Sequence, residues 1–374
     1  MSDGYIKSLD GVRALAIILV MTFHFELTHY GWLGVQLFFV LSGFLITGIL
    51  WKEKFRENSL SAKFKKFWVR RSLRIFPLYF GWLGIFGLSY LCFRFPSYYR
   101  AFIPYLSTYS FNFTRTFPIW EVTPLFTHLW SLCVEEQFYL LFPVIIFFCP
   151  PRFIRYFMVA VILLSPFSRY LLGAYYQAKG LAPAVVADAV YWNTLSHLDA
   201  FFMGGLIPVF ALDRRLKKPH WLFLAALGLA GVAGAVNYLN GPRVWSFLTD
   251  LGYNHGQTHN DEHVWHYTLL NLLFASFLLT MVSVHSRPFS ARLHRLLEAN
   301  WLVRIGKVSY GMYVYHWAIQ FYFYSRLIHS ENYYINLLFF LPYVAIVYLF
   351  SELSFRVYET RFIKLKDRYF PAVR

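Results

Sequence analysis

The sequence predicts an all-α membrane protein, a single bundle of about ten transmembrane helices. Hydrophobic residues make up 58% of the 374 residues and charged residues only 14%, whereas a soluble domain carries about 25% charged residues. Apolar runs also recur along the chain, and most have roughly the 17 to 25 residues that a membrane helix needs. A chain so poor in charge cannot cover itself with polar surface, which indicates that its solvent is a bilayer.

The apolar runs give the expected order of the helices. Polar residues interrupt the first and the sixth run, and the others are more continuous. The ten predicted spans are residues 14–31, 32–51, 75–95, 128–149, 153–172, 195–212, 219–239, 265–284, 308–328 and 334–355. Between them we expect two sizeable outer loops, at about 96–127 and 240–264, and a basic cytosolic loop at 52–74. The whole chain, 1–374, is predicted to form one membrane domain.

The basic residues indicate how this domain lies in the membrane. Lys and Arg number 35 against 19 acidic residues, a formal net charge of +16. Sorted by the predicted loops, 27 of the 35 lie on one side of the membrane and six on the other. Because cytoplasmic loops are enriched in Lys and Arg, this pattern predicts that both termini are cytosolic. It also disfavours nucleic acid as a partner, and it points to the lipid bilayer of the inner (cytoplasmic) membrane.

Ionisable residues in the first apolar run are candidates for function, since polar groups at membrane depth are costly. Asp10, Arg13 and His24 share one helical face, because the eleven residues from Arg13 to His24 make three turns plus about 20° and rise about 16 Å. A neutral histidine suits a dry site and can accept a proton, as a general base must. The alternative is an interfacial ion pair of Asp10 with Arg13 and a hydrogen-bonding role for His24.

A second cluster opens the fourth predicted span and contains His128, Ser131, Glu135 and Glu136. His128 and Glu135 are seven residues apart and nearly in phase on a helix. Two adjacent carboxylates at membrane depth favour a functional role, because an unpaired charge there is strongly unfavourable. Glu135 could orient a histidine or pair with Arg13. A structural buried ion pair is the alternative.

The third cluster lies at the cytosolic entrance of the third span. Arg70, Arg71 and Arg74 are helical neighbours, so their guanidinium groups can converge. Convergent arginines suit phosphate groups, which they bind through forked, charge-assisted hydrogen bonds. Anchoring to anionic lipid is the alternative.

Weaker signals occur later in the chain. Ser309 and His316 share a face of the ninth span, and His197 and Asp199 open the sixth. A histidine-rich outer loop has spacings that zinc could use, but its glycine and asparagine disfavour one rigid helix, so we expect no metal. The histidines of this loop are His255, His259, His263 and His266.

Five motifs, in order along nearly the whole chain, resemble the acyltransferase-3 family of multi-pass membrane O-acyltransferases. They are LDGVRALAI from Leu9 with His24, GVQLFFVLSGFLI from Gly34, RRSLRIFP from Arg70, HLWSLCVEEQFY from His128 and SYGMYVYH from Ser309. The resemblance implies a bundle of about ten helices that moves an acyl group, usually acetyl from acetyl-CoA, to hydroxyl groups of glycans or related acceptors.

The resemblance also implies roles for single residues. His24 matches the family's catalytic histidine and Arg13 its essential arginine. Arg71 and Arg74 match the family's RxxR element on the donor side, and Glu135 matches the carboxylate of its VEEQFY motif. The chain departs from the family at two places: Gln36 stands where an acid is frequent, and His197 where arginine is common. Many larger members carry a soluble esterase-like domain, and we expect none in these residues.

The expected function is transfer of an acetyl group from cytosolic acetyl-CoA to a hydroxyl of a surface carbohydrate, such as O-antigen of lipopolysaccharide or exopolysaccharide. The expected catalytic residues are His24, Arg13, Glu135 and Glu136; the donor-binding residues are Arg70, Arg71, Arg74 and Tyr79; and the other polar site residues are Asp10, His128, Ser131, His316 and Asp199. A small glycosylated or macrolide-like acceptor, a proton-coupled transporter, and assembly into a homo-oligomer are the alternatives left open.

Overall fold

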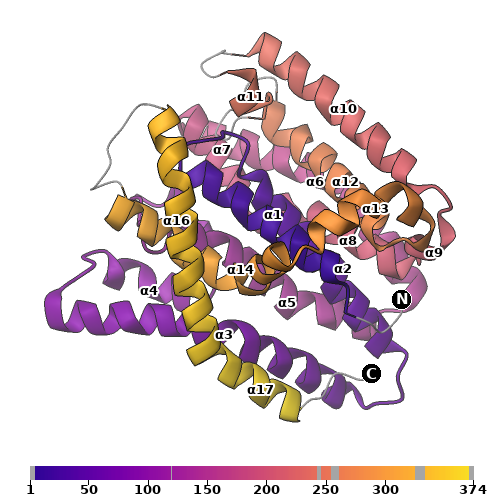
Figure 1. The fold of residues 1–374 in the computed structure, drawn as a ribbon, viewed down its shortest axis with the longest axis horizontal. Coiled ribbons are helices and arrows are strands. Elements are labelled where there is room, and N and C mark those ends of the chain that lie inside the picture. Colours follow the sequence, from indigo (N-terminus) through magenta and orange to yellow (C-terminus); the bar gives the residue numbers. More distant parts are fainter. Residues whose placement is uncertain (1–4, 119, 242–245, 254–260, 325–332, 370–374) are drawn as a thin grey trace.

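A computed structural model describes residues 5–118, 120–241, 246–253, 261–324 and 333–369 of the protein, and all regular secondary structure in these ranges is helical (Figure 1). The all-α prediction is therefore confirmed for the described residues. The helices of the first half are α1 (Lys7–His24), α2 (Leu33–Lys54), α3 (Leu60–Phe93), α4 (Tyr99–Ser107), η1 (Phe111–Thr116), η2 (Thr127–Leu129), α5 (Trp130–Phe148) and α6 (Pro151–Ala178). Those of the second half are α7 (Pro183–Trp192), η3 (Thr194–His197), α8 (Leu198–Val209), α9 (Leu212–Arg215), α10 (Pro219–Asn240), α11 (Phe247–Asp250), α12 (Glu262–Val282), η5 (Val284–Ser286), α13 (Arg287–Leu297), α14 (Asn300–Ile319), η6 (Gln320–Tyr324), α16 (Tyr333–Ser354), η7 (Phe355–Glu359) and α17 (Thr360–Tyr369).

Within the described ranges, seven helical segments are long and apolar enough to cross a membrane. They contain α2, α3, α5, α6, α10, α12 and α16. The three other predicted spans correspond to α1, α8 and α14, which do not reach this standard. Helix α1 opens with a charged turn and ends at His24, and α14 carries Arg304 and Lys307. Helix α8 has only 12 residues, which is about 18 Å of helix.

All three predicted loops contain helices, and in the outer loop at about 240–264 this helix is α11. The basic segment 52–74 is expected to be a cytosolic loop, but α3 begins at Leu60 and carries most of its cations in helical register. The predicted outer loop 96–127 contains α4 and η1. Helix α3 begins at Leu60 because Ser59 caps its first turn, accepting a hydrogen bond from the backbone N–H of Ala62 at 3.3 Å.

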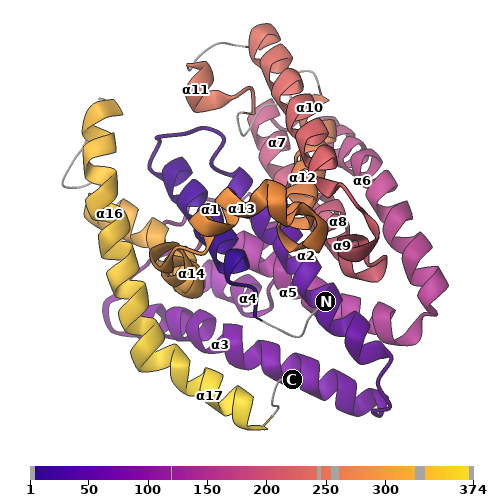
Figure 2. The same ribbon diagram turned by 45° about the vertical axis from the view of Figure 1, so that its right-hand side comes forward.

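Helices α1 and α2 lie at the centre of the bundle in both views (Figures 1 and 2). The apolar window of α2 is 78% buried, whereas those of α3, α6 and α10 are only 22% buried, so these three helices present apolar side chains outward, as helices facing lipid do. Helix α2 packs most extensively against α8, and α1 against α14. Glycine permits the close approach of α2 to α8, because a Cβ on Gly43 would fall well inside contact distance of the Phe201 carbonyl oxygen.

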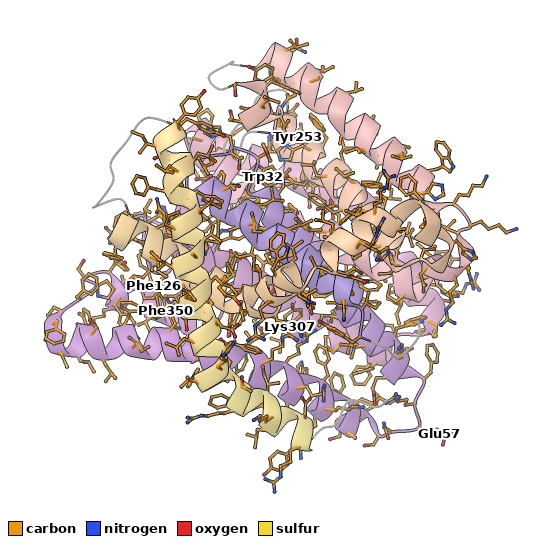
Figure 3. The ribbon with its side chains drawn as sticks, viewed as in Figure 1. Trp32, Glu57, Phe126, Tyr253, Lys307 and Phe350 are labelled. Carbon is orange, nitrogen blue, oxygen red and sulfur yellow. The ribbon has the colours of Figure 1, made fainter. Side chains whose placement is uncertain are left out.

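The ends of the central helices are fastened by hydrogen bonds to distant segments. Trp32, just before α2, donates from its indole N–H to the carbonyl oxygen of Tyr253 at 2.8 Å, and Figure 3 labels both residues among the densely packed side chains. Trp32 is only 2% exposed. The link holds the start of α2 against the segment that precedes α12, and thereby fixes one end of the region in which the predicted site residues lie.

Candidate functional site

A cavity of about 110 Å³ lies where α1, α2, α3, α5 and α14 meet. We call it the arginine cavity, because one arginine of α1 and two of α3 line it together with two carboxylates of α5. Its polar lining residues are Arg13, Ser42, Arg71, Arg74, Ser131, Glu135, Glu136, Tyr139, Ser309, Tyr310 and Tyr313. All five sequence motifs therefore contribute residues to this one cavity.

The carboxylate wall of this cavity is held by a hydrogen-bond chain between α2 and α5. The hydroxyl of Ser42 donates to Oε1 of Glu135 at 2.7 Å, and the hydroxyl of Tyr139 donates to Oγ of Ser42 at 3.1 Å. The guanidinium of Arg71 lies over the ring of Tyr139, 5.1 Å from its centroid. These contacts orient Glu135 toward the arginines of α3.

The two arginines of α3 differ from Arg13 in how their charge is compensated. Arg13 forms an ion pair with Asp10 one turn earlier in α1, and the hydroxyl of Tyr5 donates to the same carboxylate. In the described part of the chain, Arg71 and Arg74 form no ion pair closer than 4.0 Å. Their guanidinium groups are therefore available to an anionic ligand, which they can bind with forked hydrogen bonds.

A second cavity, of about 240 Å³, contains His24. We call it the tryptophan cavity, because five indole rings from different parts of the chain line it. Its lining residues are Val20, Phe23, His24, Trp32, Val35, Arg115, Trp120, Val122, Thr127, His128, Trp130, Asp188, Tyr191, Trp192, Tyr313 and Trp317. Burial raises the pKa of the Tyr191 hydroxyl well above its ordinary value, so this group stays neutral.

His24 is the last residue of α1 and is packed against aromatic rings of α14. Its imidazole stacks on the indole of Trp317, with ring centroids 4.4 Å apart and an interplanar angle of 26°. The imidazole of His316 lies 5.1 Å from it, centroid to centroid. The stacking on Trp317 and the contact with His316 hold the imidazole of His24 at one wall of the tryptophan cavity. This packing restricts the directions in which its ring nitrogen atoms point.

His128 and His316 have defined tautomers. Nε2 of His128 lies 3.0 Å from the carbonyl oxygen of Val314, and Nδ1 of His316 lies 2.7 Å from that of Tyr313. Since a carbonyl oxygen only accepts hydrogen bonds, each of these nitrogens carries the hydrogen in the neutral ring. The other ring nitrogen of each is left as an acceptor, and both atoms are buried without a hydrogen-bond partner among the described residues.

The two cavities are stacked along α1 and share the residues Val35 and Tyr313. Arg13 lines the first and His24 the second, eleven residues later, which is about 16 Å along a helix axis. The hydroxyl of Tyr313 donates to the carbonyl oxygen of His128 at 2.8 Å and lies 2.5 Å from Oγ of Ser131. This tyrosine therefore stands at the boundary between the two cavities.

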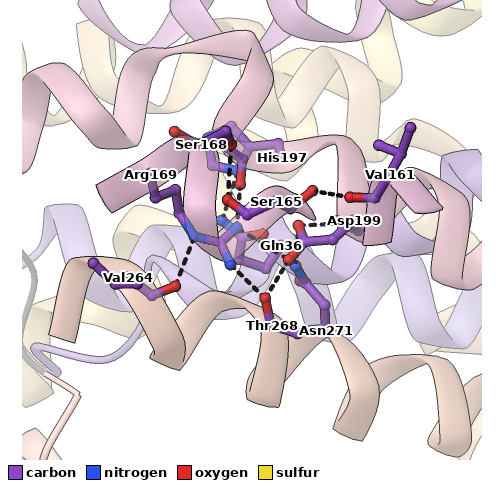
Figure 4. Close-up of polar contacts among 12 residues, drawn as sticks. Gln36, Val161, Ser165, Ser168, Arg169, His197, Asp199, Val264, Thr268 and Asn271 are labelled. Carbon is purple, nitrogen blue, oxygen red and sulfur yellow. Dashed lines mark hydrogen bonds and ion pairs between the residues drawn. The ribbon is translucent and has the colours of Figure 1, made fainter. Parts of the chain in front are cut away.

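A third polar cluster lies entirely within the bundle and joins α6, α8 and α12 (Figure 4). Nη1 of Arg169 lies 3.0 Å from Oδ2 of Asp199, and both side chains are fully buried. Thr268 donates to the same oxygen at 2.6 Å, and Asn271 donates to Oδ1 at 3.0 Å. Asp199 lines neither cavity, so the structure gives it a contact that fastens helices together.

The two departures from the family motifs contact each other. Nε2 of Gln36 lies 3.0 Å from Nδ1 of His197 (Figure 4), and both side chains are fully buried. Nε2 of His197 faces the carbonyl oxygen of Tyr191, so that nitrogen carries the hydrogen and Nδ1 accepts from the amide of Gln36. An acid and an arginine at these positions would make a buried ion pair, and here a neutral hydrogen bond takes its place.

Two residues predicted to bind the donor lie away from the arginine cavity. Arg70 forms an ion pair with Asp367 of α17, at 3.6 Å. Tyr79 is fully buried and donates to the carbonyl oxygen of Leu106 at 2.9 Å. The reason is helical phase, since Tyr79 is five residues beyond Arg74 and so points about 140° away from it.

Other residues of the two cavities are not among the predicted site residues. Ser42 and Tyr139 lie within the quoted motifs, so a closer reading of polar groups there could have found them. Arg115, Asp188 and Trp317 carry no sequence signal beyond their residue type. Of the histidines considered for zinc, His263 and His266 lie on α12, whereas His255 and His259 lie outside the described residues.

Comparison with known proteins agrees with the motifs. A family model described as an acyltransferase domain, acyltransferase 3, matches residues 6–354. The chain is 28% identical over 374 residues to the O-acetyltransferase OatA of Staphylococcus aureus strain NCTC 8325 / PS 47, and equally to OatA of strain COL; each alignment covers 96% of this chain and 57% of the relative. The chain thus spans little more than half the length of these relatives. No solved structure matches the chain significantly.

The buried Arg169–Asp199 pair predicts a large effect on stability. Replacing Arg169 by Leu leaves Asp199 as an uncompensated buried charge, which costs about 3–5 kcal/mol. The thermal midpoint of the detergent-solubilised protein should fall sharply, and a second change, Asp199→Asn, should restore part of it. The control is Arg356→Leu, which removes a 67% exposed partner of Glu352 and should change the midpoint little. Equal midpoints for Arg169→Leu and Arg356→Leu would contradict this assignment.

Proposed function

Because the chain belongs to the acyltransferase-3 family, we propose that it is a membrane O-acetyltransferase that moves an acetyl group from acetyl-CoA to a hydroxyl group of a carbohydrate. The observation that carries the proposal is the stacking of two chemically different cavities along α1, one lined by arginines and one by His24 and indole rings. A transfer enzyme needs two binding sites that meet, one for the donor and one for the acceptor.

The arginine cavity is the proposed donor site. Arg71 and Arg74 are one helical turn apart, line the same cavity, and form no ion pair within 4.0 Å in the described residues. Phosphate groups of CoA are the anions that such a pair binds well. The side chain of Arg74 is exposed, so the phosphates can reach it from outside the bundle. The pantetheine arm would then extend past Arg13 toward Tyr313, at the boundary of the two cavities.

The tryptophan cavity is the proposed acceptor site, with His24 as the general base. Indole rings stack on the apolar faces of sugars, and His24 at the cavity wall is positioned to take a proton from a hydroxyl. The acceptor oxygen attacks the acetyl carbonyl carbon, the ester C–O bond forms, and the thioester C–S bond breaks. The proton passes to His24 and then to the departing sulfur, so the products are an O-acetyl ester and free CoA.

The position of Glu135 favours one of the two roles that its sequence motif suggests. The sequence alone favours either a contact with a histidine or a pair with an arginine. Glu135 lies in the arginine cavity, held by Ser42, whereas His24 lies in the tryptophan cavity. Its position therefore supports a role in orienting the arginines around the donor, with Glu136 beside it on the same cavity wall.

The orientation of the two cavities in the cell membrane and the class of acceptor belong to the same proposal. The positive-inside pattern supports a cytosolic opening for the arginine cavity, where acetyl-CoA is available, and an outward opening for the tryptophan cavity. A surface polysaccharide such as O-antigen or exopolysaccharide suits that side of the membrane. The match to an acyltransferase family favours this reading over a proton-coupled transporter, which buried charges alone would also suit.

Removing the imidazole of His24 should slow acetyl transfer strongly. In the His24→Ala variant we expect the rate of acetyl transfer to fall by about 10²- to 10⁴-fold, the usual contribution of a general base. The measurement follows label from radioactive acetyl-CoA into the acceptor fraction in detergent, without a membrane gradient. The control variant is His285→Ala, because His285 is an exposed histidine that lines neither cavity. A folded His24→Ala protein with the parent rate would refute this role.

Removing a phosphate-binding arginine should weaken donor binding. For Arg74→Ala we expect the KM for acetyl-CoA to rise by about 10- to 100-fold, as expected for the loss of hydrogen bonds to a charged group. With S-acetyl-pantetheine, a donor without phosphates, parent and variant should have the same KM. Lys65→Ala is the control, since Lys65 is an exposed cation of the same helix outside the cavity. An unchanged KM for acetyl-CoA would contradict the donor site.

A further inference from the structure

The rim of the tryptophan cavity holds an ion pair that the proposed reaction does not use. Arg115 of η1 donates from Nη2 and Nε to Oδ2 of Asp188, at 2.6 and 3.2 Å. The guanidinium lies over the indole of Trp120, 5.3 Å from the ring centroid. Both charged side chains are partly accessible, 18% for Arg115 and 24% for Asp188. The pair therefore faces the cavity while it joins η1 to α7.

This pair sets the charge of the cavity. Arg115 and Asp188 are the only residues with a formal charge among the described residues that line it. In the neutral ring of His128, Nε2 donates its hydrogen to the carbonyl oxygen of Val314, and Tyr191 remains neutral. The lining thus has one positive and one negative charge, so it offers no net charge to a ligand.

The remaining wall is rigid and aromatic. The indole of Trp192 lies edge-on to Trp120, with ring centroids 4.8 Å apart, and parallel to Trp130, at 5.6 Å. Trp130 and Trp192 are each only 6% exposed, so their positions are fixed by packing. Such a wall fits the flat C–H face of a pyranose ring.

We infer that the tryptophan cavity binds an uncharged sugar residue of the acceptor, and that the Arg115–Asp188 pair selects it against anionic sugars. This inference rests on the proposed function and names the class of acceptor. Neighbouring hydroxyl groups of a neutral sugar can donate to Asp188 and accept from Arg115 without breaking the pair. A uronic acid would bring its carboxylate beside Asp188, where the two negative charges repel.

Binding of two matched sugars to the purified full-length protein tests this inference. The probes are a neutral glucose trisaccharide and the same trisaccharide with glucuronic acid in place of one glucose, and the readout is quenching of tryptophan fluorescence without acetyl-CoA. We expect the neutral probe to bind the parent protein about five-fold more tightly, the size of effect that charges at a partly exposed site produce. Equal affinities, or no binding of the neutral probe, would overturn the inference.

Two variants with opposite charge changes separate recognition from a structural role. Asp188→Asn leaves the positive charge of Arg115 uncompensated, so affinity for the glucuronate probe should rise by about five-fold. Arg115→Gln should lower that affinity further. A purely structural role would change both affinities in the same direction in the two variants, and that result would overturn the inference. The control is Glu121→Gln, the loss of an exposed carboxylate next to Trp120 that does not line the cavity.

The readouts distinguish the two proposals. Failure of label transfer from acetyl-CoA, together with preferential binding of the neutral probe, would refute the proposed reaction and leave the sugar site standing. Transfer with equal binding of both probes would refute the selectivity and leave the reaction standing.

Discussion

Charge inside an apolar bundle must be compensated, and this constraint organises the whole structure. Arg13 is paired with Asp10 in its own helix, and Arg169 with Asp199 across two helices. Both pairs bury their carboxylates almost completely. Arg71 and Arg74 are the exception at the arginine cavity, because no carboxylate of the described residues pairs with them there. Arginines without such a partner, beside a cavity, are the places where a ligand of opposite charge is expected.

Helix α1 connects this constraint to chemistry. Its regular helical rise puts Arg13 and His24 about 16 Å apart on related faces, so one rigid element contributes to both cavities. Tight packing of α1 on α14 brings Trp317 and His316 against His24. The same contact places Tyr313 between the cavities. The two cavities, which are the proposed donor and acceptor sites, are therefore both built on the packing of these two helices.

Local sequence patterns predicted the elements and part of the site, and their limits have physical causes. Helical phase correctly grouped Arg71 with Arg74, since one turn of helix is a local property. Tyr79 was predicted from its place in the same motif, whereas helical phase turns it about 140° away from Arg74. Arg70 was grouped with its neighbours, but its partner Asp367 lies at the far end of the chain. The helix boundary at Leu60 was also missed, because positive charges in the first turns of α3 resemble a loop.

Contacts between distant segments lay beyond sequence reasoning. Gln36 and His197 are 161 residues apart in the sequence, yet they form a hydrogen bond. This contact explains why the two departures from the family pattern occur together in one chain. Arg115 and Asp188 meet because η1 packs on α7.

We propose that donor and acceptor enter the protein by opposite ends of α1. Proteoliposomes with the protein in one known orientation test it most directly, with labelled acetyl-CoA sealed on one side and a neutral oligosaccharide supplied on the other. We expect label on the oligosaccharide only when acetyl-CoA is on the side of Arg74, with the oligosaccharide opposite. Transfer that requires both substrates on the same side would contradict it.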